Sequence, residues 1–168
     1  MSNQRTIYIV LSDTGTWFTR MIRWYTKAPL NHASIAFDPQ LTEVYSFGRK
    51  DPRNPFIGGF VKEDMQGKLF QNATIAVYRC IVSESQFKKI RSIVGQFEVE
   101  SHLYTYNLLG LLGVMLNIPI KRKKAYFCSQ FVASVFEGAN VRLVSKCAAL
   151  TTPADLVQSD LIELMTGS

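Results

Sequence analysis

The sequence predicts a mixed fold of β-strands and α-helices that forms one domain over residues 1–168. The first half contains short segments that alternate apolar and polar residues or are rich in strand formers, such as "TIYIVL", "HASIAF" and "EVYSF". After residue 82 the apolar residues recur with the period of an α-helix. With 168 residues and 47% hydrophobic content, the chain can bury a sizeable core without metals or disulfides.

Strands dominate the predicted first half of the chain. Residues 6–11 form the first strand, and Trp17 and Trp24 follow within a segment of helical spacing. "HASIAF" and "EVYSF" can pair as a hairpin around the turn-forming "DPQ", and residues 73–82 form a further strand. Residues 48–68 contain proline, glycine and many charges, so we expect a long loop there.

Helices dominate the predicted second half. Ser83 and Gln86 form a capping-box pattern in front of a helix that extends to Phe97. Two more helices are expected, over residues 127–138 and 153–165, the latter opened by "TTPAD". The apolar run "LLGLLGVMLNIPI" is too short to span a bilayer, and we interpret it as a buried core helix.

Cys128 stands at the predicted start of a helix, shortly after the basic run "KRKK". Most single cysteines are small buried hydrophobes, but in a first helical turn the unpaired N–H groups and the macrodipole favour a thiolate. A nucleophilic thiolate needs a base, and the chain contains two histidines. His32 opens a predicted strand, which can hold an imidazole rigidly beside a helix terminus. His102 lies in no regular element, and we expect it on the surface.

The other cysteines, Cys80 and Cys147, are interpreted as packing residues. The three cysteines show no spacing typical of a zinc site or a disulfide framework, which indicates a reducing compartment. The apolar segment near the N-terminus is too short for the core of a signal peptide. We therefore expect a cytoplasmic protein.

The segments "NHASIAFD", "YFCSQFV" and "TPADL" together resemble the circularly permuted branch of the NlpC-type papain-like cysteine hydrolases. In that branch the strand with the histidine precedes the helix with the cysteine. The resemblance implies an α+β fold in which a small antiparallel sheet holding His32 packs against helices, with Cys128 at a helix N-terminus. It also implies that Cys128 attacks a carbonyl, that His32 acts first as base and then as acid, and that no metal or organic cofactor takes part.

The third member of such a site departs from the commoner pattern of this family, which places a His, Glu, Asn or Gln on the strand after the histidine strand. Aligning the predicted hairpin puts Ser46 nearest to that place, where it can orient the imidazole by accepting its N–H but adds no charge. Tyr45 faces the opposite side unless the register slips by one residue. Tyr126, two residues before Cys128, either lines the pocket or packs, and we prefer packing. If the site has tyrosines that bind substrate, Tyr45 and Tyr126 are the candidates.

The function that these residues predict is a thiol hydrolase that cleaves an amide or ester bond through an acyl-enzyme. The substrate class stays open among small molecules, peptides and lipid acyl groups, because the papain-like core serves all of them. One alternative is a lipid-directed acyltransferase or hydrolase at a membrane surface, in which "NLLGLLGVMLNIPIKRKK" docks on anionic lipid. Another is a catalytically weak binding module of the same fold.

The net charge of +6 favours anionic partners, but most basic residues are scattered along the chain. No nucleic-acid motif and no basic-aromatic interleaving is present, so we expect no nucleic-acid partner. Docking on a membrane surface is the less favoured interpretation, since a core helix also explains the leucine-rich run. The sequence does not indicate an oligomeric state.

Overall fold

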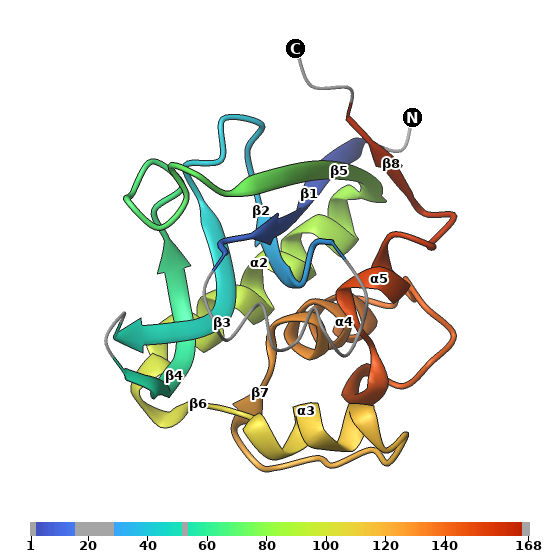
Figure 1. The fold of residues 1–168 in the computed structure, drawn as a ribbon. Helices are drawn as coiled ribbons and strands as arrows, with labels where there is room; N and C mark the ends of the chain where they lie inside the picture. The colour runs from blue at the N-terminus through green and yellow to red at the C-terminus, as the bar shows by residue number, and fades with distance from the viewer. Residues whose placement is uncertain (1–2, 16–28, 52–53, 166–168) are drawn as a thin grey trace.

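The computed structural model describes residues 3–15, 29–51 and 54–165, which form an α+β fold around a six-stranded sheet (Figure 1). The strands run in the order β4-β3-β2-β1-β5-β8, and each pair of neighbours is antiparallel. The helix expected around Trp17 and Trp24 lies outside the described residues. The strands are β1 (Gln4–Asp13), β2 (His32–Ala36), β3 (Val44–Asp51), β4 (Asn54–Glu63), β5 (Thr74–Ser83) and β8 (Ile162–Leu164).

The helices follow mainly in the second half of the chain and lie largely on one side of the sheet (Figure 1). A second, two-stranded parallel sheet joins β6 to β7. The remaining elements are α2 (Glu84–Val99), η1 (Ser101–Leu103), β6 (Thr105–Tyr106), α3 (Leu108–Met115), β7 (Ala125–Tyr126), α4 (Cys128–Gly138), η2 (Ala148–Leu150) and α5 (Pro153–Leu156).

The main core lies between one face of the sheet and helices α2 and α4. Its centre is aromatic: the Phe47 ring contacts those of Phe60, Phe97 and Phe131, with centroids 5.9, 5.7 and 5.3 Å apart. These contacts join two strands to both helices. The aromatic cluster therefore fixes the position of α4 against the sheet, and with it the position of the residue that begins α4.

Several predicted elements are confirmed. The capping box at Ser83 and Gln86 opens α2, and α4 begins one residue after the expected position and ends at Gly138. The hairpin of β2 and β3 forms around Asp38, whose carboxylate accepts the backbone N–H groups of Thr42 and Glu43. These local signals did not depend on distant contacts.

The long loop expected over residues 48–68 is wrong. β3 continues to Asp51, and β4 adds a ten-residue strand at the edge of the sheet. The paired glycines of this strand are explained by close packing rather than by a turn. A Cβ atom at Gly59 would lie 2.5 Å from the carbonyl oxygen of Tyr104, and one at Gly58 would lie 2.9 Å from Tyr106 Cβ.

The helix expected over residues 153–165 is also wrong beyond its first turn. Thr152 caps α5 as predicted, but the helix ends at Leu156, and residues 162–164 form β8. β8 covers the edge of β5 through the pairing of Ile162 with Cys80. Backbone pairing with an otherwise open sheet edge therefore overrode the helical pattern.

The leucine-rich run is not a buried core helix. Of the eight residues of α3, those that are buried are Gly110 and Gly113, whereas Leu109 and Leu112 are exposed. Within the described part of the chain, no helix is both long enough and apolar enough to cross a bilayer.

The close packing of β4 gives a test of the fold. We expect Gly59→Ala to destabilise the protein by about 1–3 kcal/mol, because the added methyl group would displace the backbone of Tyr104. Gly95→Ala on α2 is the matched control: nothing lies within 4 Å of a Cβ atom there, so the free energy of unfolding should rise by up to about 1 kcal/mol. Urea denaturation measures both, and equal effects would contradict the packing of β4 against residues 104–106.

Candidate active site

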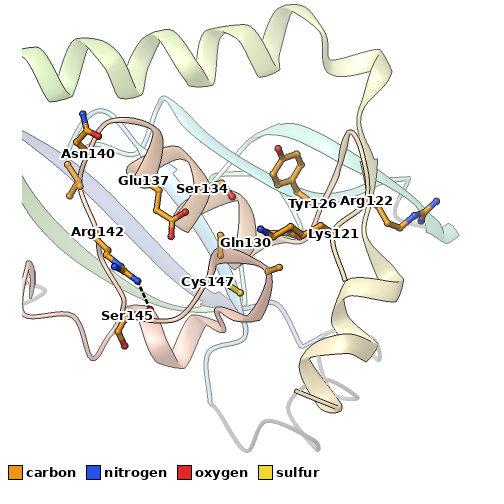
Figure 2. Close-up of a pocket in the computed structure, with 13 residues that line it drawn as sticks. Lys121, Arg122, Tyr126, Gln130, Ser134, Glu137, Asn140, Arg142, Ser145 and Cys147 are labelled. Carbon is orange, nitrogen blue, oxygen red and sulfur yellow. Dashed lines mark hydrogen bonds between the residues drawn. The ribbon is translucent and has the colours of Figure 1, made fainter. Parts of the chain in front are cut away.

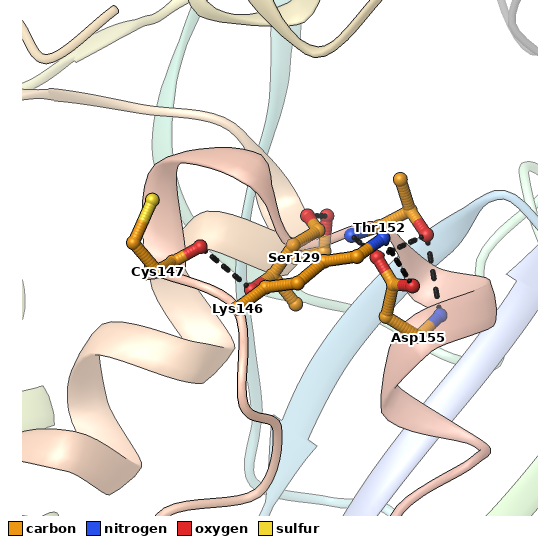
Figure 3. Close-up of polar contacts among 6 residues, drawn as sticks. Ser129, Lys146, Cys147, Thr152 and Asp155 are labelled. Atoms are coloured by element: carbon orange, nitrogen blue, oxygen red, sulfur yellow. Dashed lines mark hydrogen bonds and ion pairs between the residues drawn. The ribbon is translucent and has the colours of Figure 1, made fainter. Parts of the chain in front are cut away.

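Cys128 is the first residue of α4, and the surrounding contacts hold this helix terminus firmly. Gln130 Oε1 accepts the backbone N–H of Phe127 at 3.3 Å, and the Ser129 hydroxyl donates to the carbonyl of Thr151 at 2.7 Å (Figure 3). The same figure shows the capping of α5, in which Thr152 and Asp155 bond each other reciprocally. Ser129 thus anchors the start of α4 to the backbone of Thr151, the residue before the capped turn of α5.

His32 opens β2 and lies within hydrogen-bond reach of the Cys128 side chain. The Cys128 sulfur is also 3.9 Å from the carbonyl oxygen of Asn31, the residue before the strand. On the other side of the ring, His32 Nε2 is 2.5 Å from Glu63 Oε1. The imidazole therefore lies between a thiol and a carboxylate.

Glu63, the last residue of β4, accepts hydrogen bonds from three side chains. Besides His32, the hydroxyl of Ser46 donates to Oε1 at 2.5 Å and that of Ser34 to Oε2 at 2.7 Å. Hydrogen bonds at both oxygens fit an ionised carboxylate, although its side chain is only 7% exposed. A neutral His32 that donates from Nε2 has Nδ1 unprotonated, and Nδ1 is then the nitrogen that can accept the Cys128 proton.

The antiparallel pairing explains how these residues meet. Ile35 pairs with Tyr45, and Val44 pairs with Glu63, so His32, Ser34, Ser46 and Glu63 all lie on the sheet face opposite the main core. Three neighbouring strands therefore supply one continuous polar network.

The electrostatics of this network favour an imidazolium–thiolate pair. Burial by itself lowers the pKa of His32, but the charge of Glu63 and hydrogen bonds to Cys128 and Glu63 outweigh it and raise this pKa well above its ordinary value. Burial by itself raises the pKa of Cys128, but the His32 side chain and the backbone N–H groups of Ala33 and Ser129 outweigh it and lower the pKa. The pKa of Glu63 is likewise lowered, against the effect of burial, by His32 and both serines.

Tyr106 is a further residue at the sulfur, and it was not among the predicted ones. Its hydroxyl is within hydrogen-bond reach of the Cys128 side chain and accepts the Cys128 backbone N–H. Burial and the thiolate raise the pKa of Tyr106 well above its ordinary value, which keeps the phenol neutral and able to donate. Tyr106 pairs with Tyr126 in the parallel β6–β7 sheet, and Tyr126 is two residues before Cys128, the first residue of α4. This pairing brings Tyr106 close to Cys128.

The structure brings together only part of the predicted site. Cys128 and His32 meet as expected, and Ser46 lies on the expected face. Its hydroxyl donates to Glu63, however, and it is Glu63, not Ser46, that accepts the ring N–H of His32 and orients the ring. Glu63 was not among the predicted residues because residues 48–68 resemble a loop.

The two predicted substrate-binding tyrosines both pack in the aromatic core. Tyr45 stacks on Phe60 at a centroid distance of 5.8 Å, and Tyr126 contacts Phe47 at 5.3 Å. Tyr126 also lines a groove of about 960 Å³ between α4, residues 121–122 and residues 140–149 (Figure 2). Cys128 is not among the residues that line this groove, so the groove and the thiol are separate features.

Neither of the other cysteines joins this network. Cys80 lies in the core, where burial raises the pKa of its thiol to about 11, and Cys147 is exposed at the groove. Within the described part of the chain, no cluster of three or more His, Cys, Asp or Glu side chains could hold a metal ion. No known protein family and no curated protein sequence matches this chain.

The pH dependence of alkylation tests the ion pair. In a Cys147→Ser background, we expect iodoacetamide to modify Cys128 with an inflection below the pH of an ordinary thiol, because His32 stabilises the thiolate. Glu63→Gln should move this inflection to higher pH, since losing the carboxylate lowers the pKa of His32 and thereby raises that of Cys128. The modified residue is identified by mass spectrometry.

The matched control is Glu43→Gln, which removes an exposed carboxylate that pairs with Arg91 at 2.9 Å. Its profile should coincide with that of the unsubstituted protein. An inflection that stays in place in Glu63→Gln would contradict the role given to the carboxylate.

Proposed function

We propose that the chain is a cysteine hydrolase of the circularly permuted, NlpC-type papain-like class, which cleaves an amide or ester bond. One observation carries this proposal: a thiol at a helix N-terminus lies beside a histidine whose far nitrogen is bonded to a buried carboxylate. The chain order agrees with it, since the histidine strand precedes the cysteine helix. Glu63 takes the role of the third catalytic residue. It lies on β4, whereas the family commonly places this residue on the strand directly after the histidine strand, which here is β3.

The reaction begins with attack of the Cys128 thiolate on the carbonyl carbon of the substrate. The C–S bond forms, the carbonyl electrons move to oxygen, and the Tyr106 hydroxyl is placed to donate to that oxyanion. As the tetrahedral intermediate collapses, His32 gives its Nδ1 proton to the leaving amine or alcohol. The product of this half-reaction is a thioester on Cys128.

Water then completes the cycle. His32, now neutral, takes a proton from the water as its oxygen attacks the thioester carbon, and the Cys128 thiolate leaves beside the regenerated imidazolium. Glu63 stays ionised throughout, holds the ring in one orientation and stabilises its positive charge. The acid product leaves with both catalytic side chains restored.

Glu63 also bears on the alternative of a catalytically weak binding module. That interpretation rested on Ser46 as the third residue, because a hydroxyl cannot stabilise an imidazolium. The carboxylate of Glu63 supplies the missing charge, and two serines hold it in place. A complete network of this kind favours a working enzyme over a binding module.

Substitutions should separate the three roles. With a hydrolysable substrate selected from libraries of amide and ester probes, Cys128→Ala and His32→Ala should abolish turnover. Glu63→Gln should lower kcat/KM by roughly tenfold to a hundredfold, because a charge-assisted bond is lost. Ser46→Ala should lower it by about threefold to tenfold, because one neutral donor to Glu63 is lost.

The control is His102→Ala, which removes an exposed imidazole in η1 and should leave kcat/KM unchanged. Circular dichroism confirms that each variant is folded. Full activity in Glu63→Gln, or loss of activity in His102→Ala, would contradict the proposed roles.

A further inference from the structure

Helix α3 is apolar throughout, and it buries its small residues and exposes large ones. Its sequence, "LLGLLGVM", contains no charged residue, and its buried residues are the two glycines. Apart from Asn117, the exposed side chains on its outer surface and in the turn after it are apolar: the exposed fractions are 50% for Leu109, 52% for Leu112, 69% for Leu116 and 53% for Ile118. A globular protein normally turns such side chains toward its core.

The glycines fix this orientation. A Cβ atom at Gly110 would lie 2.3 Å from Asn107 Nδ2, and one at Gly113 would lie 2.4 Å from the carbonyl oxygen of Ile118. The Asn107 side chain caps the helix by accepting the Gly110 N–H at 2.9 Å and also donates to the carbonyl of Ile120 at 3.1 Å. Rotating α3 to bury its leucines would lose these contacts, so the apolar face is held outward.

A cationic strip adjoins this face. Lys121, Arg122 and Lys123 follow Ile118 within five residues and are exposed, and no carboxylate among the described residues forms an ion pair with them. Lys124, by contrast, pairs with Glu100 at 3.2 Å. No Asp or Glu occurs in the sequence between Glu100 and Glu137.

We infer that the docking face, defined as Leu109, Leu112, Leu116, Ile118 and the cations at 121–123, binds the surface of an anionic lipid bilayer. The four aliphatic side chains enter the boundary between headgroups and acyl chains, while the cations pair with lipid phosphates and carboxylates. α3 lies at the opposite end of the molecule from β8, where it can approach a flat surface (Figure 1). Docking on a membrane surface was the less favoured interpretation of the sequence, because a buried core helix also explained the leucine-rich run. Since α3 is exposed, that objection no longer applies.

The charges favour a bilayer over a second copy of the chain. An isologous dimer through this face would bring two sets of three cations together, and the carboxylate that lines the groove with Lys121 and Arg122, that of Glu137, offers one negative charge against three positive ones in each copy. The cations at 121 and 122 also line the groove of Figure 2, where they remain accessible. An anionic surface satisfies both the apolar side chains and the cations at once.

Docking does not depend on the proposed chemistry, although the two regions are adjacent. Tyr106, whose hydroxyl lies at Cys128, and Asn107 directly precede α3. The docked face therefore positions the candidate thiol close to the bilayer surface. The test of docking is made without any catalytic readout.

Flotation with vesicles tests the inference on the full chain. We expect binding to phosphatidylcholine vesicles that contain phosphatidylserine, and far weaker binding to phosphatidylcholine alone. Lys121→Gln/Arg122→Gln/Lys123→Gln should lower the partition coefficient about a hundredfold, given the attraction of each cation to an anionic surface. Leu112→Glu/Leu116→Glu, which places carboxylates at two exposed apolar positions, should abolish binding.

The matched control removes the same charge elsewhere. Lys68→Gln/Lys88→Gln/Lys89→Gln alters three exposed lysines away from α3 and should retain binding to within a few-fold. An equal loss in this control, or equal binding to neutral vesicles, would overturn the inference. A failure to bind the anionic vesicles would also overturn it. If the protein were then a dimer that Leu112→Glu/Leu116→Glu dissociates in sedimentation velocity, the face would be a self-interface.

Cys128→Ala should bind vesicles like the unsubstituted protein. Because flotation reports docking alone and alkylation of Cys128 reports the thiol alone, failure of one proposal is distinguishable from failure of the other.

Discussion

The buried carboxylate of Glu63 is the constraint on which the candidate site depends. An ionised group with so little exposure is costly unless donors replace its water, and three side chains do so here. Those donors come from β2 and β3, so the network can form only when the strands pair in their observed register. The same interaction that makes burial tolerable also fixes the His32 ring and determines which of its nitrogens faces Cys128.

Linkage to pH follows from the directions of the pKa shifts. The lowered pKa of Glu63 contributes stability above the pKa of an unfolded glutamate, and this contribution is lost as the pH falls through the folded value. The raised pKa of His32 contributes stability below the pKa of an unfolded histidine, and this contribution is lost as the pH rises through the folded value. Between the pKa of an unfolded glutamate and that of an unfolded histidine both contributions are present in full. The imidazolium–thiolate pair itself exists between the lowered pKa of Cys128 and the raised pKa of His32.

The sequence predicted the elements whose signals are local, and it missed those that depend on tertiary contacts. The cap at Ser83, the start of α4 and the strand of His32 each follow from a few adjacent residues. Glu63 was missed because the glycines of β4 resemble a turn, whereas close tertiary contacts, with Tyr104 and Tyr106 among them, explain why these residues are glycines. Tyr106 was missed because β6 is two residues long, too short for any periodic pattern.

Helix α3 shows why composition alone could not decide between core and surface. When every residue of a helix is apolar, the hydrophobic pattern has no polar face to mark the outside, and burial becomes the default interpretation. The signal that decides is the three-residue spacing of Gly110 and Gly113, because side chains without a Cβ atom allow the closest approach to the body of the protein. Leucines then occupy the remaining, outward positions. Small residues on one face and large aliphatic residues on the other indicate which side of such a helix packs.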